Sequence, residues 1–203
     1  MILTVLSNKG GSGKSTSAVH LAAYFQMLAP TLLLDGDQTR NALAWSQRGP
    51  GLPFKVAPID QAAMLARSHT HVVIDTGQRL GAEDLKAAAD GCDWLVIPAV
   101  PSALDVDSTG QTVRALQELG HTRFCVLLTK VAADSTHEVN ELRALLSSMK
   151  VRTVKASIPR FKAFERAAGA GQLVQDMADR NGVRGWAAYQ EAGKEIQKWA
   201  RQK

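Results

Sequence analysis

Cysteine is scarce in this sequence of 203 residues, and long apolar runs are absent. The two cysteines, Cys92 and Cys125, form no C-x-x-C pair, so we expect two free thiols in a cytoplasmic protein. No apolar run approaches the roughly 20 residues that a membrane-spanning helix needs. The first apolar run, residues 2–6, begins so early that we expect no signal peptide ahead of it.

Excess positive charge is also absent from the first three quarters of the chain. Residues 1–149 hold 12 Lys and Arg against 14 Asp and Glu, a net charge of −2. Residues 150–203 hold 12 against 5, a net charge of +7. This asymmetry favours a polyanion-binding face in the last quarter, although a solvated basic helix would give the same count. The hydrophobic content of 45% is ordinary for a soluble globular protein.

Short apolar runs alternate with helical patterns along the chain, which predicts an α/β fold with a mainly parallel sheet. The expected strands are residues 2–6, 31–34, 54–57, 71–76, 94–98, 124–128 and 152–155. The expected helices are a segment from about residue 15 to a stop at Pro30, then residues 39–45, 61–68, 81–90, 106–119, 136–148 and 184–201. We expect Gly193 to weaken the last of these helices at its middle.

A glycine-rich stretch between the first strand and the first helix carries the strongest functional signal. It reads Lys9-Gly10-Gly11-Ser12-Gly13-Lys14-Ser15-Thr16. Glycines let successive backbone N–H groups point at phosphate oxygens, and the helix adds the positive end of its dipole. A lysine and a serine at the end of such a loop reach phosphates and Mg²⁺. The stretch therefore predicts a phosphate-binding loop.

Aspartates follow two of the expected strands. Asp35 and Asp37 end the second strand, and Asp75 ends the apolar run 71–74. Parallel strands present their carboxyl ends at one edge of the sheet, where α/β folds place ligands. Because hard cations prefer carboxylate and water oxygens, Asp75 is a candidate Mg²⁺ residue. Capping of the helix 39–45 would also explain the Asp35 and Asp37 pair.

Taken together, these motifs resemble the ParA/MinD family of ATPases. Lys9 matches the early lysine of the family's deviant Walker A loop, and Asn8 stands where the general motif has its first glycine. The pattern D-x-D-P-Q is matched at Asp35 and Asp37 but departs at Gln38 and Thr39. The Walker B run, a P-S-x-L-D segment at residues 101–105 and an I-P-R turn at residues 158–160 follow in the expected order.

The resemblance implies a three-layer P-loop NTPase fold over residues 1–203, with ATP and Mg²⁺ as cofactors. Lys9, Lys14 and Asp37 would be catalytic, Asp37 by orienting water and Lys9 by reaching the nucleotide of a partner protomer in an ATP-sandwich homodimer. Ser15, Asp35 and Asp75 would serve Mg²⁺. The implied nucleotide contacts are Lys9, Gly10, Gly11, Ser12, Gly13, Lys14, Ser15, Thr16, Thr129, Lys130, Pro159 and Arg160. Asp105 would lie at the dimer interface or cap the helix 106–119.

The basic last quarter leaves three interpretations open. Trp186, Tyr189, Ile196 and Trp199 recur at helical spacing and would dock the last helix on the domain. Its basic residues would bind DNA phosphates, or the helix would lie on a membrane, which we expect less. The candidate DNA contacts are Arg152, Lys155, Arg184, Lys198 and Arg201.

The resemblance implies a cytoplasmic, nucleoid-associated partition ATPase that segregates plasmid or chromosomal DNA. It would bind DNA without sequence preference and be released when a centromere-binding adaptor of the ParB or ParG sort stimulates hydrolysis. No helix-turn-helix segment is expected before the first strand. One alternative keeps the mechanism but moves a protein cargo, such as carboxysomes or chemoreceptor clusters. Another class, an iron–sulfur ATP-dependent reductase, would need Cys92 and Cys125 to hold a cluster between protomers.

Overall fold

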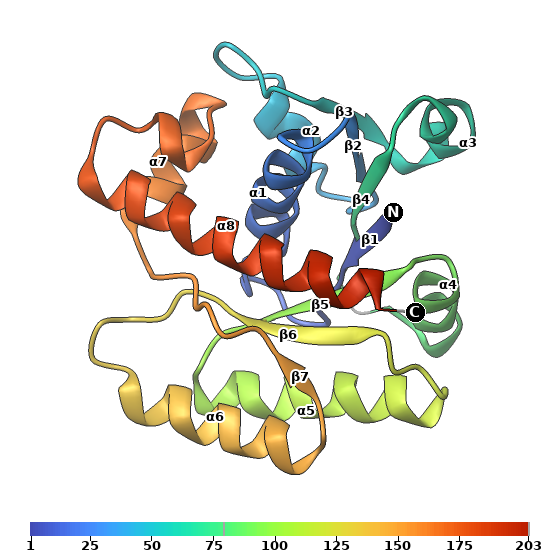
Figure 1. Ribbon diagram of the computed structural model, residues 1–203, viewed down its shortest axis with the longest axis vertical. Helices are drawn as coiled ribbons and strands as arrows, with labels where there is room; N and C mark the ends of the chain where they lie inside the picture. Colours follow the sequence, from blue (N-terminus) through green and yellow to red (C-terminus); the bar gives the residue numbers. More distant parts are fainter. Residues whose placement is uncertain (79, 203) are drawn as a thin grey trace.

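Seven parallel strands form a central sheet in the computed structural model, which describes residues 1–78 and 80–202. Their order across the sheet is β3-β2-β4-β1-β5-β6-β7 (Figure 1). The bounds are β1 Ile2–Val5, β2 Thr31–Asp35, β3 Lys55–Pro58, β4 His71–Asp75, β5 Trp94–Ala99, β6 Phe124–Leu128 and β7 Arg152–Thr153. The predicted α/β fold is confirmed.

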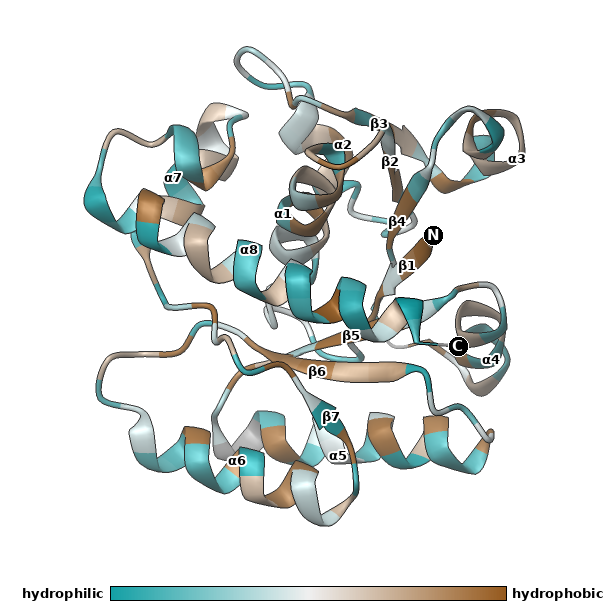
Figure 2. Cartoon of the chain, viewed as in Figure 1, coloured by the Kyte–Doolittle hydropathy of each residue, from teal (hydrophilic) through white to brown (hydrophobic). Residues whose placement is uncertain are grey.

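Helices cover both faces of this sheet (Figure 1). One face packs against α1 (Lys14–Gln26), α2 (Asn41–Ser46), α7 (Lys162–Ala170) and α8 (Arg180–Arg201). The other packs against α3 (Ala62–Leu65), α4 (Ala82–Asp90), α5 (Ala103–Glu118) and α6 (Thr136–Ser148). Figure 2 shows the central strands mostly brown and the helices striped in brown and teal, the pattern of elements that bury one face.

The strand register brings the predicted functional segments to one edge. Val5 at the end of β1 pairs with Asp75, and Asp75 pairs with Asp35 of β2. The glycine-rich loop follows β1 directly, so it lies beside both carboxylates. This edge is the carboxyl end of the parallel strands, as the sequence predicts.

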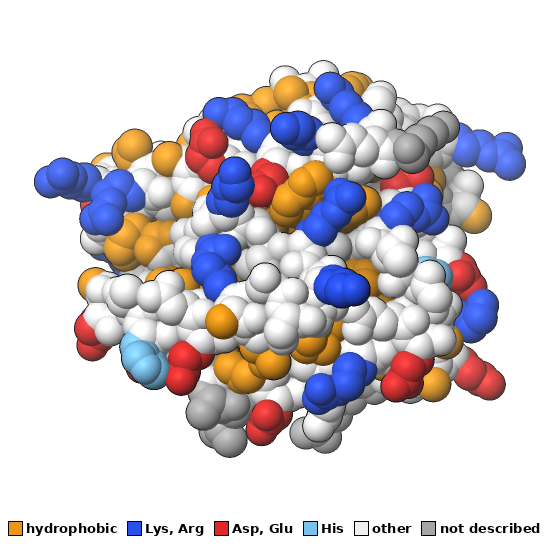
Figure 3. Space-filling view, turned by 60° about the horizontal axis from the view of Figure 1, so that its bottom comes forward, with side chains coloured by type: hydrophobic (Ala, Val, Ile, Leu, Met, Phe, Trp, Pro, Cys, Tyr) orange, Lys and Arg blue, Asp and Glu red, His pale blue; other side chains and the backbone are white. Residues whose placement is uncertain are grey.

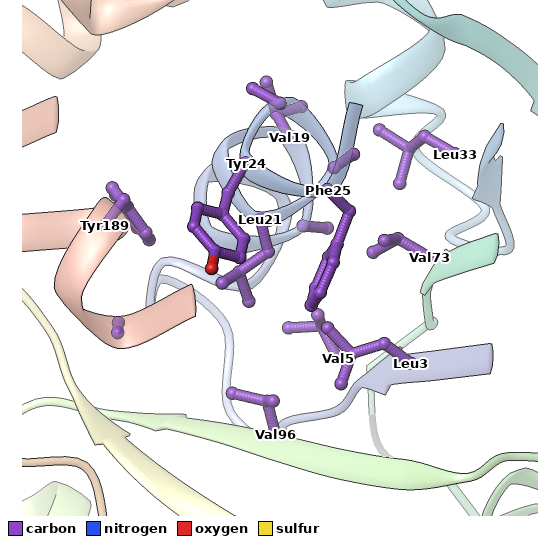
Figure 4. Close-up of a cluster of buried hydrophobic side chains, with 14 of the residues drawn as sticks. Leu3, Val5, Val19, Leu21, Tyr24, Phe25, Leu33, Val73, Val96 and Tyr189 are labelled. Atoms are coloured by element: carbon purple, nitrogen blue, oxygen red, sulfur yellow. The ribbon is translucent and has the colours of Figure 1, made fainter. Parts of the chain in front are cut away.

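Helix α1 is buried between the sheet and α8. Its Leu21 and Phe25 are fully buried beside sheet residues, while Tyr24 lies toward α8 (Figure 4). A Cβ added at Gly193 of α8 would lie 2.4 Å from Tyr24 Cδ1, far inside contact distance. Helix propensity predicts only that Gly193 weakens α8. In the fold, the missing side chain of Gly193 also allows α8 to cross α1 closely.

Several element boundaries differ from the sequence prediction. Helix α7 was not predicted, because its core-facing residues are mainly alanines, such as Ala163 and Ala167, and give a weak apolar pattern. Helix α8 begins at Arg180 rather than residue 184, since Asp179 accepts a hydrogen bond from Gly182 N–H as its N-cap. The predicted helix 61–68 is broken into α3 and two short 3₁₀ turns, Ile59–Gln61 and Ala66–Ser68.

Candidate functional site

The glycine-rich loop turns sharply before α1. Gly11 and Gly13 have φ values of 81° and 85°, in the left-handed region that favours glycine. Helix α1 then begins at Lys14, and Ser17 N–H donates to Gly13 C=O at 2.8 Å. The loop residues surround a pocket at the amino end of α1, where N–H groups and the helix dipole favour an anion.

Lys14 lies between two carboxylates in this pocket. Its Nζ is 2.9 Å from Asp37 Oδ2 and 3.3 Å from Asp75 Oδ1. All three side chains are buried. The structure therefore brings Lys14, Asp37 and Asp75 together, and the two aspartates offset the lysine charge where phosphates would otherwise do so.

The two aspartates differ in how easily they ionise. Burial acts to raise the pKa of Asp37, but hydrogen bonds from Lys14 and Thr39 outweigh it and hold the pKa below its ordinary value. Burial raises the pKa of Asp75 to about 6, against the lowering effect of Lys14. Asp37 is therefore ionised at neutral pH. At Asp75, the positive charge of Lys14 only partly offsets the effect of burial on the pKa.

Asp75 also has a buried oxygen without a partner. Its Oδ2 accepts no hydrogen bond within residues 1–78 and 80–202. A Mg²⁺ ion with its water would supply both the missing donor and the missing charge. Ser15 lies on the lining of the same phosphate pocket. The residues present therefore fit Mg²⁺.

Asp35 shapes the loop after β2. Its Oδ1 accepts from Asp37 N–H at 3.0 Å and its Oδ2 from Leu43 N–H at 2.9 Å. Asp37 in turn is oriented by Thr39, whose N–H and Oγ1–H both donate to Asp37 Oδ1. Thr39 therefore positions Asp37, although it stands where the family pattern has glutamine. The role of Asp35 toward Mg²⁺ stays a prediction.

A second pocket of about 300 Å³ adjoins the loop. Four of the predicted nucleotide contacts, Thr129, Lys130, Pro159 and Arg160, line it, together with Gly13 and Thr16 of the loop and α1. Thr129 Oγ1–H donates to Ser12 C=O at 2.6 Å, so Thr129 also supports the loop. The sequence did not predict three aromatic residues of the lining, Phe161, Phe164 and Tyr189. The spacing of Tyr189 indicated only a docked helix, and Phe161 and Phe164 gave no functional signal in the sequence.

A buried histidine lies behind this pocket. Val174 N–H donates to His20 Nε2 at 3.1 Å, so the proton is on Nδ1, which donates to Thr16 C=O at 2.7 Å. Trp45, Phe164 and Tyr189 pack against the ring. Burial lowers the pKa of His20 to about 4, so the ring is neutral at physiological pH.

This burial makes stability depend on pH. An unfolded His20 binds a proton below its ordinary pKa of 6.5, whereas the folded ring binds one only below about 4. As the pH falls from 6.5 to about 4, this group should therefore lower the free energy of unfolding by about 1.4 kcal/mol per pH unit, about 3 kcal/mol in all. His20→Gln should remove this component in urea titrations at several pH values. The control His137→Gln, at a side chain that is 80% exposed, should keep it; an unchanged slope in His20→Gln would contradict the assignment.

Lys9 lies at the rim of the phosphate pocket. Its Nζ is 2.7 Å from Asp105 Oδ1, and Ser102 Oγ–H donates to Asp105 Oδ2. Asp105 is in the first turn of α5, whose N-cap is Ser102, so the capping alternative for Asp105 is wrong. In this protomer Lys9 thus pairs within its own chain. Its predicted contact across a dimer stays a prediction.

The candidate DNA contacts fall into separate places. Arg152, Lys155 and Lys198 line one groove between β7 and α8, with Lys194 beside them. The Arg152 guanidinium lies over the rings of Trp94 and Trp199, at 5.4 and 5.7 Å.

Two candidates lie outside this groove lining. Arg184 packs over Phe161, and Arg201 lies in the last turn of α8. Figure 3 shows one face with Lys and Arg across its centre and Asp and Glu mainly around its rim. The apolar residues of α8 do dock the helix, since Tyr189 and Ile196 are buried in the core and Trp186 and Trp199 pack against it.

The cysteines do not form a cluster site. Cys92 is buried among the side chains that pack with α4, α5 and α6, and Cys125 among those that pack with α1 and α8. They therefore belong to cores on opposite faces of the sheet. Burial raises the pKa of both thiols, that of Cys125 to about 12, so both stay protonated. This geometry does not support the iron–sulfur alternative.

The CobQ/CobB/MinD/ParA nucleotide binding domain matches residues 3–174. The chain belongs to this family. The resemblance seen in the motifs is thereby confirmed. That the pocket around Lys14 is the nucleotide site stays a prediction.

Two relatives are similar over most of their length. The Maintenance of carboxysome distribution protein A of Gloeobacter kilaueensis is 32% identical over 201 residues, covering 96% of this chain and 93% of that protein. Protein ParA of Rhizobium radiobacter is 24% identical over 195 residues, covering 89% and 88%.

Solved structures share the fold. MinD of Pyrococcus horikoshii with Mg-ADP has a TM-score of 0.75 at 17% identity, covering 98% of this chain and 97% of that one. An ATP complex of a Cyanothece McdA variant has a TM-score of 0.71 at 18% identity, covering 98% and 95%. Those ligands, ATP and Mg-ADP, match the cofactors predicted here.

Within the described part of the chain, no helix combines the length and apolar character needed to cross a bilayer.

Proposed function

We propose that this chain is a Mg²⁺-dependent ParA-type ATPase that positions a protein cargo along DNA, and that the cargo is the carboxysome. The choice of cargo is supported by the 32% identity, over nearly the whole chain, to a carboxysome distribution protein. The sequence motifs alone favour plasmid partition. The comparisons support the protein-cargo alternative better, and plasmid partition remains the second candidate through its 24% identical ParA relative.

The pocket geometry supports hydrolysis. The loop N–H groups and Lys14 would bind phosphates, which requires Lys14 to exchange its contacts with Asp37 and Asp75 for phosphate oxygens. Bound Mg²⁺, held by Ser15 and through water by Asp75, would offset phosphate charge. Asp37, once released by Lys14 and still oriented by Thr39, would hold the attacking water.

The groove between β7 and α8 supports DNA binding. Lys155 and Lys198 are exposed there, and Arg152 is held by two aromatic rings. Glu191 and Glu195 lie in the same lining, and Lys194 pairs with Glu191 at 2.7 Å. Lysine and arginine contacts to phosphates carry no sequence information, which suits a protein that uses any DNA as its track. Homodimerisation with ATP and release by an adaptor of the cargo belong to the same proposal.

We expect binding to random-sequence DNA with ATP, and much weaker binding with ADP or without nucleotide. The affinity should fall steeply with salt, because basic side chains that bind phosphates release counterions. Replacing Lys155 and Lys198 with alanine should flatten the slope of log K against log salt by about 2. The control Lys86→Ala, on α4, should not change it. Binding that ignores nucleotide or salt would count against the proposal.

One genetic experiment separates the two candidate functions. In the source organism, deletion of the gene should leave carboxysomes clustered, as seen by fluorescence of a labelled shell protein, with plasmid retention unchanged. The reverse result, plasmid loss with normally spaced carboxysomes, would replace the proposed cargo by the second candidate.

A further inference from the structure

A buried hydrogen bond joins α8 to the start of α1, and the roles given above do not use it. Tyr189 of α8 is 1% exposed and Ser17 of α1 is fully buried. The Tyr189 hydroxyl and Ser17 Oγ are 3.0 Å apart. Ser17 lies in the first turn of α1, only two residues after Ser15 and directly after Thr16.

His20 makes a second connection at the same place. Its ring stacks on the Tyr189 ring, with centroids 4.9 Å apart and planes 14° from parallel. Its Nδ1–H donates to Thr16 C=O, and its Nε2 accepts from Val174 N–H, just before α8. The first two turns of α1 are therefore held to α8 and to the segment that leads into it.

Tyr189 also lines the pocket beside the loop. It shares this lining with Gly13, Thr16 and Phe164, and it meets the Phe164 ring edge to face at 5.8 Å. A Cβ at Gly185 of α8 would lie 2.8 Å from Phe164 Cζ, so α8 is packed tightly on this wall. A displacement of α8 would therefore move both the pocket wall and the first turn of α1.

We propose that Tyr189 is a positioning residue of the nucleotide site: through Ser17 it fixes the first turn of α1, and nucleotide bound at that turn in turn holds α8 in place. The second half follows from the first, because a coupling between two sites is reciprocal. Since α8 carries Lys194 and Lys198, which line the groove between β7 and α8, this contact links the nucleotide to that surface. The inference rests on nucleotide binding in the proposed function, and not on its cargo or on DNA.

A matched pair of tyrosines provides the test. Tyr24 of α1 also joins the two helices, since its hydroxyl donates to Gln197 Oε1 of α8 at 3.2 Å, but it lies two turns further along α1. Tyr189→Phe should weaken Mg-ADP binding, measured by calorimetry on the full chain, by about 5- to 10-fold. Tyr24→Phe should change it by less than about twofold. Both variants lose one interhelical hydrogen bond, the Tyr189 bond in a buried position and the Tyr24 bond in a partly buried one, so urea titration of both variants accompanies the affinity measurements.

Hydrogen exchange tests the reciprocal effect. Mg-ADP should slow exchange of α8 amides in the unchanged chain and in Tyr24→Phe, and should slow it less in Tyr189→Phe. Ser17→Ala, a smaller change, should weaken Mg-ADP binding like Tyr189→Phe, and the double variant should be no weaker than either single one.

Equal affinities in Tyr189→Phe, Ser17→Ala and the unchanged chain would overturn the inference. Equal losses in Tyr189→Phe and Tyr24→Phe would also overturn it. An unchanged chain that binds no Mg-ADP would overturn both the inference and the nucleotide part of the proposed function. Failure of DNA binding or of carboxysome positioning alone would overturn only those parts of the proposed function.

Discussion

Asp37→Ala should lower the rate of ATP hydrolysis by at least about a hundredfold, while ATP affinity changes by no more than a few fold. Asp37 lies at the phosphate pocket, 2.9 Å from Lys14 Nζ, and two hydrogen bonds from Thr39 fix its orientation. Its depressed pKa keeps it ionised at neutral pH, as a group that orients water requires. Phosphate binding depends mainly on the loop and Lys14, so it should survive. Steady-state phosphate release and ATP calorimetry would measure the two effects.

Three further variants sharpen this result. Asp37→Asn keeps an oxygen that Thr39 can bind but removes the charge, and should be nearly as slow as Asp37→Ala. Thr39→Ala removes the Oγ1 hydrogen bonds to Asp37 and from Asn41 but keeps the backbone N–H bond to Asp37, and should cost a smaller factor in rate, on the order of 10-fold or less. Asp134→Ala, at an exposed carboxylate outside the pocket linings, should hydrolyse ATP normally. Hydrolysis by Asp37→Ala at a near-normal rate would show that another group orients the water.

Much of this pocket could be predicted because its parts follow local rules. Asp35 and Asp75 end neighbouring parallel strands, so the topology alone brings them together. Gly11 and Gly13 occupy left-handed positions that the glycine-rich loop anticipates. The contact of Lys14 with Asp37 and Asp75 was not predicted, because the motifs describe a loop that holds phosphate and not the ion pairs that replace it.

The wall of the second pocket could not be predicted in the same way. Tyr189 follows Ser17 by 172 residues, and their contact depends on how α8 crosses α1. That crossing needs Gly193, which on helix propensity alone counts only as a weak point. Helix α7 adds Phe164 to the wall. The sequence did not predict this helix, because alanines make up its buried face. Long-range packing, rather than local pattern, determines this part of the site.

The basic last quarter shows a similar division. The charge count favours a polyanion-binding face, which stays a prediction. The spacing of Tyr189 and Ile196 predicted a docked helix, and their burial confirms it. The groove, however, requires β7 and α8 to lie side by side, which no spacing reveals. Arg184 was grouped with the other candidates by sequence, but in the fold it packs over Phe161, a residue of the second pocket.

Lys9→Ala should abolish ATP-dependent dimerisation and, with it, hydrolysis, while each monomer still binds nucleotide. In the single chain the Lys9 ammonium is 2.7 Å from Asp105, and its side chain is 38% exposed. The Lys9 ammonium is accessible to water, and although the Asp105 side chain is only 12% exposed, it keeps the hydrogen bond from Ser102 Oγ–H when Lys9 leaves. In a dimer, a phosphate group of the partner's nucleotide offers a stronger, charge-assisted contact. The lysine is therefore worth more to the dimer than to the monomer, and alanine should remove mainly the dimer.

Light scattering after size-exclusion chromatography, with ATP, ADP and no nucleotide, measures this directly. The unchanged chain should double its mass only with ATP, and more clearly in the slow-hydrolysing Asp37→Ala background. Lys9→Ala in the same background should remain a monomer at all three conditions, with ATP affinity within a few fold of the parent. Lys86→Ala removes an exposed lysine that pairs with Asp90 on α4, away from the pocket, and should dimerise normally. A full-mass dimer of Lys9→Ala with ATP would show that Lys9 serves only its own chain, through Asp105.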